Sequence, residues 1–182
     1  MKKTILITGI AGTGKSSIIS VLQHRGYTAY GIEDITGMCR MINRETGETI
    51  SHEIGSNLVT FKNHDWICDI KAVQDLIQKN SHGLNFYSGT ATNIDDLLQL
   101  FDQIFLLQAD KKELSRRLIE RVNNRFGKSK AEQDWLFEHQ LVWDKALIQK
   151  GAIPIDATQD IKTVATSIIE MSKTKRPVSQ VE

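Results

Sequence analysis

The residues with the clearest chemical potential are the eight from Gly9 to Ser16, which read Gly-Ile-Ala-Gly-Thr-Gly-Lys-Ser. They match G-x-x-x-x-G-K-S, the pattern of a phosphate-binding P-loop, at every fixed position. Glycine tolerates the positive φ angles that aim several backbone N–H groups at one polyphosphate. The pattern therefore predicts that Gly9, Gly12, Thr13 and Gly14 cradle the phosphates of a nucleotide.

Side chains at the end of the motif add charge and a metal ligand. Lys15 is expected to reach the β- and γ-phosphates, and the Ser16 hydroxyl is expected to bind Mg²⁺. Ser17 continues the helix that opens here, and the positive N-terminal end of that helix favours an anion.

The flanking segments have the composition that this motif requires. Residues 4–8, Thr-Ile-Leu-Ile-Thr, are a short apolar run typical of a parallel strand buried on both faces. Ile18, Val21 and Leu22 then recur at helical spacing. A strand, a glycine-rich loop and a helix are thus predicted in the order a phosphate site needs; a turn that fits by chance is the alternative.

Two acidic residues follow the second predicted strand. Residues 26–30, Gly-Tyr-Thr-Ala-Tyr, favour a turn and a strand, and Glu33 and Asp34 come where that strand should end. Ligands of open α/β sheets bind outside the carboxyl ends of the strands. Both carboxylates are therefore expected on the same side as the P-loop.

Composition limits the class of protein. The chain has 182 residues, 40% of them hydrophobic, and suits a single domain over residues 1–172 with a polar tail at 173–182. The net charge of +1, from 23 basic and 22 acidic residues, does not favour nucleic acid as a partner. No apolar run approaches the roughly 20 residues that span a bilayer, so no membrane partner is expected.

The two cysteines, Cys39 and Cys68, are too few for a disulfide framework or a zinc site. Each is expected to be a reduced thiol, which fits a cytoplasmic location. The apolar run after Met1 breaks at Gly9, so it indicates a strand rather than a secretory signal.

The remaining chain alternates between strand and helix patterns. Residues 35–65 are irregular and are expected to form a partly helical insert over the acceptor site. Apolar residues at helical spacing predict a helix from Trp66 to Ile77. Three more strands are predicted at 84–87, 104–107 and 153–155, the last at a sheet edge because of its proline.

Helices are predicted after each of these strands. Asn93 or Asp95 is expected to cap a short helix, and Asp110 a helix whose Leu114, Leu118 and Val122 face inward. A longer helix follows, with one stripe of Trp135, Val142 and Ala146 and a second of Leu136, Trp143 and Leu147. The alternation predicts an α/β fold with a parallel sheet between helices.

With these residues assembled, the chain resembles the P-loop kinases of small molecules: nucleoside monophosphate kinases, shikimate kinase and gluconate kinase. The resemblance covers most of the chain in element order and is specific at the P-loop and at residues 117–128. The second segment looks like the lid of a poorly characterised bacterial branch often labelled AAA-family ATPase. The resemblance implies a three-layer P-loop NTPase fold with a five-stranded parallel sheet, a small lid at about 121–131, and use of ATP with Mg²⁺.

The basic residues that enter the lid of this group close over the ATP phosphates, which implies that role for Arg117 and Arg121. Their i, i+4 spacing places both on one helix face. Simple surface ion pairs are the alternative, because Glu113 precedes Arg117 by four residues and Arg116 precedes Glu120 by four.

The two acids resemble the D-x-D-type motif that shikimate and gluconate kinases carry after their second strand. The first position of the motif is Gly31 here, and the second is Glu33, which is a departure. Glu33 or Asp34 could hold a Mg²⁺-bound water or accept the proton of an attacking hydroxyl, and the sequence leaves open which does which. A helix-capping Asp34 with an exposed Glu33 is the alternative.

Acceptor and adenine contacts are implied by position within the family. Arg40 and Arg44 lie where family members bind the acceptor's anionic group, although an isolated arginine is more often a surface residue. Gly89 lies in a small-residue loop that lets a ligand approach the backbone. Nucleotide kinases have an acidic residue and Gly-Phe-Pro-Arg there, so an ordinary nucleoside monophosphate is disfavoured. The segment 156–158, namely Asp156, Ala157 and Thr158, follows the last strand, where the family cradles adenine.

These observations predict an ATP-dependent phosphotransferase acting on a small hydroxyl- or phosphate-bearing metabolite, as a monomer or homodimer. The catalytic candidates are Lys15, Glu33, Asp34, Arg117 and Arg121. A nucleotide-binding regulatory module, or a slow ATPase without an acceptor, is the alternative function.

Overall fold

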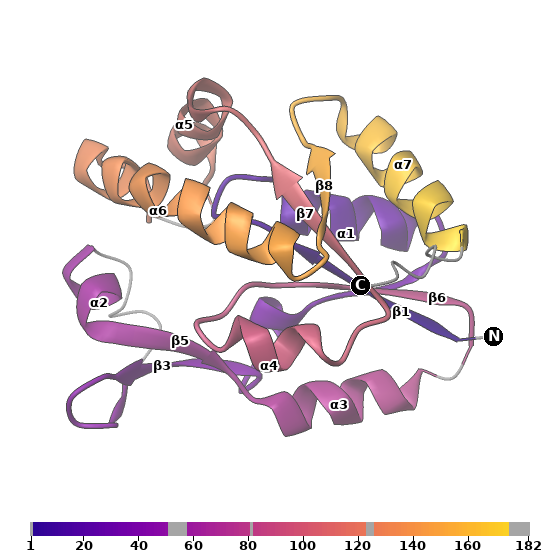
Figure 1. Ribbon diagram of the computed structural model, residues 1–182, viewed down its shortest axis with the longest axis horizontal. Coiled ribbons are helices and arrows are strands. Elements are labelled where there is room, and N and C mark those ends of the chain that lie inside the picture. The colour runs from indigo at the N-terminus through magenta and orange to yellow at the C-terminus, as the bar shows by residue number, and fades with distance from the viewer. Residues whose placement is uncertain (1, 51–57, 81, 123–125, 175–182) are drawn as a thin grey trace.

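The computed structural model describes residues 2–50, 58–80, 82–122 and 126–174. A five-stranded parallel sheet forms its centre, in the order β2-β6-β1-β7-β8 (Figure 1). The strands are β1 Lys3–Thr8, β2 Thr28–Gly31, β6 Leu84–Ser88, β7 Gln103–Gln108 and β8 Ile153–Asp156. The predicted sheet is confirmed, and Pro154 lies in the edge strand β8, as proline in a sheet usually does because it lacks a backbone N–H.

Helices cover both faces of the sheet, as predicted. On one face α1 (Lys15–His24) and α7 (Ile161–Lys173) pack around Ile5 and Ile7 of β1. On the other, α3 (Ile70–Lys79), α4 (Ile94–Leu98) and the end of α6 (Lys130–Gln149) pack around Leu6. Successive residues in the middle of β1 thus enter two different cores, which is why Ile5, Leu6 and Ile7 are all apolar.

The insert between β2 and α3 is mainly an antiparallel ribbon. After the 3-10 turn η1 (Ile32–Asp34) come β3 (Cys39–Asn43), β4 (Thr49–Ile50), the short helix α2 (Leu58–Asn63) and β5 (His64–Cys68). This ribbon extends away from the five-stranded sheet (Figure 1). The prediction of helix from Trp66 is wrong, because Asp69 caps α3 by accepting a hydrogen bond from the Ala72 N–H at 3.0 Å, and the residues before this cap pair with β3.

The two cysteines are bonded to each other, so the expectation of two reduced thiols is wrong. Cys39 and Cys68 lie opposite each other in the β3–β5 register, with their Cα atoms 4.2 Å apart, and form a disulfide. Opposite residues of an antiparallel pair come this close only when a ribbon brings them into register. The sequence pattern of the insert did not reveal this ribbon.

Helices α5 (Lys111–Glu120) and α6 form a hairpin beside the P-loop. Asp110 caps α5 as predicted, since its carboxylate accepts a 2.8 Å hydrogen bond from the Glu113 N–H. Leu114 and Leu118 are buried as predicted, but Val122 is 88% exposed because α5 ends at Glu120. Val142 is also exposed, so the predicted stripe through it is wrong; the stripe of Leu136 and Leu147 is the buried one.

The hairpin has a small core of its own that reaches the P-loop. Ile10 and Ala11 of the P-loop pack against this core. Its five buried side chains are Leu114, Leu118, Phe126, Leu136 and Phe137. A Cβ on Gly12 would lie 3.1 Å from Leu118 Cγ, and one on Gly127 would lie 2.9 Å from Leu118 Cδ2. Leu118 therefore fills space that two glycines leave on either side of it.

No helix in the described part of the chain is long and apolar enough to cross a bilayer. The proposed tail falls mostly on residues 175–182, and residues 123–125 of the predicted lid likewise lie outside the described residues.

Candidate active site

The P-loop connects β1 to α1 in a form suited to an anion. Gly12 and Gly14 have φ angles of 90° and 97°, which side chains with a Cβ rarely adopt. Gly14 is the N-cap of α1, and no side chain caps the helix. The first N–H groups of α1 are therefore left for a ligand, which is the arrangement that holds phosphate at helix N-termini.

Lys15 folds back over this loop. Its ammonium donates a 2.8 Å hydrogen bond to the Gly9 carbonyl. Burial lowers the pKa of Lys15; the carboxylates of Glu33 and Asp34 oppose that lowering, and the Arg121 cation adds to it. The charges that act on the Lys15 ammonium therefore come from two other parts of the chain: Glu33 and Asp34 belong to η1 after β2, and Arg121 follows α5.

The acids are placed by η1, directly after β2. Glu33 is half-buried and its Oε1 accepts a 3.1 Å hydrogen bond from the Thr90 N–H, in the loop after β6. A Cβ on neighbouring Gly89 would lie 3.4 Å from Ile32 Cβ and 3.7 Å from Glu33 Cγ. Asp34 is the last residue of η1 rather than a helix N-cap, so the arrangement differs from the capping alternative.

Arg121 lies just beyond α5 and turns toward the lid loop. Its Nη2 donates to the Phe126 carbonyl. Burial lowers the pKa of the guanidinium, and the Glu132 carboxylate opposes the change. Its Nε–H is buried without an acceptor among the described residues. An arginine in this state has a donor to offer an anion.

Arg117 bonds different parts of the chain from those that Arg121 bonds. Its Nη2 donates to the Ala157 carbonyl at 2.7 Å, its Nη1 to the Thr13 carbonyl at 3.4 Å, and its Nε to Glu113 at 2.7 Å. The ion pair with Glu113 that the sequence left as the alternative is present, and the same guanidinium also bridges the P-loop to the loop after β8.

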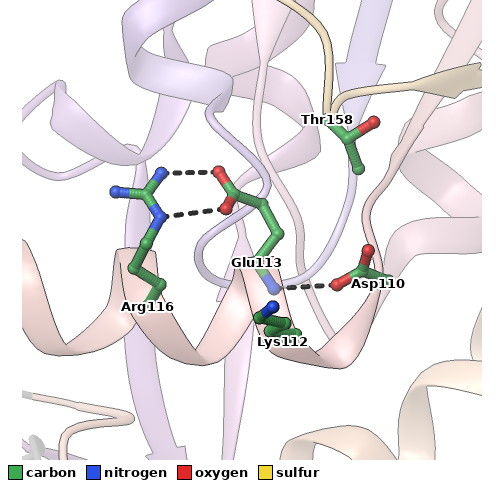
Figure 2. Close-up of a pocket in the computed structure, with 5 residues that line it drawn as sticks. All are labelled: Asp110, Lys112, Glu113, Arg116 and Thr158. Carbon is green, nitrogen blue, oxygen red and sulfur yellow. Dashed lines mark hydrogen bonds and ion pairs between the residues drawn. The ribbon is translucent and has the colours of Figure 1, made fainter.

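A pocket of about 430 Å³ opens beside this bridge. Its lining residues come from the start of α5 and from the loop after β8: Asp110, Lys112, Glu113, Arg116 and Thr158 (Figure 2). Hydrogen bonds from Arg116 and Arg117 lower the pKa of Glu113 to about 2. Asp156 is not among these residues; its carboxylate accepts hydrogen bonds from the N–H and hydroxyl of Thr158.

The two predicted acceptor arginines lie on the ribbon and contact neither Lys15 nor the charged groups that act on it. Arg44 is exposed and pairs with Asp65 at 2.8 Å, with a further bond to the Lys62 carbonyl. Arg40 is exposed and lies opposite Ile67, so it is on the other ribbon face from Trp66.

Several contributing residues escaped the sequence analysis. Thr92 and Asn93 hold the ribbon: the Thr92 N–H donates to the Trp66 carbonyl at 2.7 Å, and the Asn93 amide bonds both the N–H and the carbonyl of Cys68. Ser129 and Glu132 form a capping box at the start of α6, and Glu132 also accepts from the Gly127 N–H. The capping box was legible as S-x-x-E; the contacts of Thr92 and Asn93 were not, because their partners are distant in the sequence.

No protein-family model matches the sequence, and no curated protein sequence matches it significantly. Solved structures do match. Shikimate kinase from Acinetobacter baumannii, in complex with shikimate, superposes with a TM-score of 0.60 at 17% identity, covering 96% of this chain and 97% of that one. Deoxyadenosine kinase from M. mycoides, with bound dATP, gives 0.58 at 15% identity, covering 94% and 100%.

A gluconokinase from Sinorhizobium meliloti 1021 gives a TM-score of 0.56 at 14% identity, covering 93% of each chain. The chain therefore has the fold of the P-loop small-molecule kinases over nearly its whole length. Likeness at such low identity establishes the fold and leaves the activity to be argued from the site.

Proposed function

We propose that this protein is a phosphotransferase that moves the γ-phosphoryl group of ATP to a small acceptor bearing a hydroxyl or a phosphate. The observation that carries the proposal is a P-loop that leaves the N-terminus of α1 uncapped, with Lys15 folded over it and the charges of Glu33, Asp34 and Arg121 acting on this lysine. Phosphoryl transfer needs cations to offset the charge of the phosphates and a carboxylate to orient the acceptor, and it asks little other chemistry of the protein.

The nucleotide is proposed to lie along the P-loop with its phosphates at the open N-terminus of α1. Lys15 would exchange its bond to the Gly9 carbonyl for phosphate oxygens, and the Nε–H of Arg121, which has no acceptor among the described residues, would serve the transferring group. The Ser16 hydroxyl is exposed at the start of α1 and suits Mg²⁺, which when bound would offset phosphate charge. The base would lie near Arg117, Ala157 and Thr158, beside the pocket of Figure 2.

The acceptor is proposed to lie on the opposite side, between Glu33 and the loop at Gly89. Glu33 has one oxygen on the Thr90 N–H, which fixes its orientation, and a second oxygen for an acceptor hydroxyl. A carboxylate so placed can accept the proton as the phosphoryl group moves. A nucleotide-dependent regulatory module remains the second candidate, since the P-loop charges would serve hydrolysis as well.

Incubation with Mg-ATP and a panel of sugars, polyols, nucleosides and their phosphates tests the proposal. We expect ADP release that depends on one class of acceptor and a phosphorylated product detectable by mass spectrometry. Formation of ADP with no acceptor requirement and no new phosphoester would instead support the regulatory candidate.

The variant Lys15→Ala supplies the first prediction. We expect its turnover to fall by at least about 10²-fold, because the cation at the β- and γ-phosphates is lost. Its thermal unfolding should stay close to that of the native protein. Lys145→Ala, which removes an exposed lysine of α6, is the matched control and should keep full turnover. Native turnover in Lys15→Ala would contradict the proposed chemistry.

A further inference from the structure

At the carboxyl end of β2, the Asp34 carboxylate occupies the space that a side chain at position 31 would need. A Cβ on Gly31 would overlap Asp34 Oδ2 and would lie 3.0 Å from Asp34 Cγ. The turn η1 causes this, because it folds the chain back within three residues and brings the Asp34 carboxylate over the strand end.

Backbone conformation does not explain the glycine. Gly31 has φ −81° and ψ 108°, which is ordinary extended backbone, and it pairs in register with Ser88 of β6. Any residue could adopt these angles, and glycine in a strand carries an entropic cost. The glycine matters because it has no side chain, and the Asp34 carboxylate fills the space that this leaves.

The two acids differ in how they are held. Glu33 is tied to the Thr90 N–H and faces the loop at Gly89. Asp34 is exposed and accepts no hydrogen bond from a described residue, and its negative charge opposes the lowering of the Lys15 pKa. One carboxylate is held by the loop after β6, whereas the other is open to solvent at the end of β2.

We infer that Asp34 supplies the strand-end carboxylate that serves the magnesium-nucleotide, and that Gly31 is the positioning residue that makes room for it. Glu33 is left to the acceptor. The inference rests on the proposed function for the identity of the ligand, but it concerns binding of the metal-nucleotide and not transfer. An open carboxylate suits this role because Mg²⁺ usually keeps several waters, which carboxylates accept as hydrogen-bond donors.

The experiment compares the dissociation constant of ADP with Mg²⁺ and with EDTA, by isothermal titration calorimetry. The ratio of the two constants measures how much the metal strengthens binding. Asp34→Asn should reduce this ratio about tenfold, since a charge-assisted hydrogen bond is lost. Gly31→Ala should reduce it similarly by displacing the carboxylate, and the double variant should lose no more than either single one.

Relocating the carboxylate is the decisive variant. Gly31→Asp combined with Asp34→Gly should recover most of the magnesium effect, which a merely structural role for Gly31 would not allow. Glu138→Gln, which removes an exposed carboxylate on α6, should leave the ratio unchanged. Affinity for ADP in EDTA and the thermal midpoint report whether each variant is folded.

The inference is overturned if Gly31→Ala keeps the native ratio, if the single losses multiply in the double variant, or if the relocated carboxylate gives no recovery. A native protein without any magnesium effect on ADP would overturn it too. Failure to find an acceptor, with the magnesium effect intact, would overturn the proposed transfer and leave this inference standing.

Discussion

Arg117 and Arg121 make different contacts, although the sequence predicted that they would act together on the phosphates. The i, i+4 spacing of Arg117 and Arg121 predicted one shared clamp, but α5 ends between them, so Arg121 bonds the Phe126 carbonyl and Arg117 bonds the Ala157 carbonyl. A helical spacing implies a common face only as long as the helix lasts.

This separation predicts different kinetic defects for the two arginines. Arg121→Ala should lower kcat by about 10²- to 10³-fold with a small change in KM for ATP, because a donor to the transferring group is lost. Arg117→Ala should raise KM for ATP about tenfold with kcat nearly retained, because its contacts lie with the nucleotide-side loops.

Arg25→Ala is the control for both, since this exposed arginine follows α1 and bonds the Thr166 hydroxyl and the Lys162 carbonyl of α7. Steady-state kinetics at varied ATP concentration would make the comparison. Equal losses of kcat in Arg117→Ala and Arg121→Ala would indicate that both arginines act on the same phosphates and would contradict separate roles for them.

Among the elements, the α5–α6 hairpin packs against the P-loop through a small core in which Leu118 lies between Gly12 and Gly127. Leu118→Ala should lower the free energy of unfolding by about 2–5 kcal/mol, because the cavity would lie between Gly12 and Gly127, where the backbone cannot collapse freely. Leu141→Ala, which changes an exposed leucine of α6, should cost less than about 0.5 kcal/mol. Urea denaturation of the two variants gives the values; equal stabilities would show that Leu118 does not join hairpin and loop.

Helix α6 also carries a buried acid that the proposed chemistry does not use. Asp144 is 5% exposed and accepts hydrogen bonds from Gln108 at 2.9 Å and Gln140 at 3.5 Å. Burial raises its pKa above that of the unfolded carboxyl, and these hydrogen bonds oppose the shift. The buried charge therefore costs stability above the raised pKa, and the cost vanishes as the pH falls to the unfolded pKa.

Asp144→Asn should accordingly melt a few degrees higher than the native protein at pH of about 8, and the difference should narrow toward pH of about 4. The amide keeps an oxygen for both glutamines but carries no charge. Asp134→Asn, at an exposed position of the same helix, is the control and should show little effect at either pH. A difference in melting temperature that widens as the pH falls would contradict a raised pKa of Asp144.

Across the whole molecule, the features with local sequence signals were predicted, and those that depend on distant contacts were not. The sheet, its edge strand and the cap at Asp110 were predicted because strand periodicity, proline and helix caps are local signals. The ribbon, its disulfide and the start of α3 were not, because Cys39 and Cys68 meet only through pairing of strands 29 residues apart in the sequence. At the site, the P-loop glycines and the strand-end acids were legible as motifs, whereas the partners of Glu33 and Arg117 come from loops whose proximity only the fold creates.

The disulfide also bears on the stability of the whole chain. Reduction should lower the free energy of unfolding by about 3 kcal/mol, because a loop spanning 29 residues is released in the unfolded ensemble. The thermal midpoint should fall with added dithiothreitol in the native protein and stay constant in the double variant Cys39→Ser, Cys68→Ser. Two titratable thiols in the unreduced, denatured protein would contradict the bond.

The strand order β2-β6-β1-β7-β8 divides the molecule along its sheet. The residues proposed for the acceptor follow β2 and β6, those proposed for the nucleotide follow β1, β7 and β8 except for Asp34 after β2, and β1 lies between the two groups of strands. In evolutionary terms, such a layout lets the insert after η1 be exchanged while the nucleotide half and Asp34 are kept. A new substrate can then be acquired by changing a contiguous segment, and grafting residues 35–69 onto a relative would be the engineering counterpart.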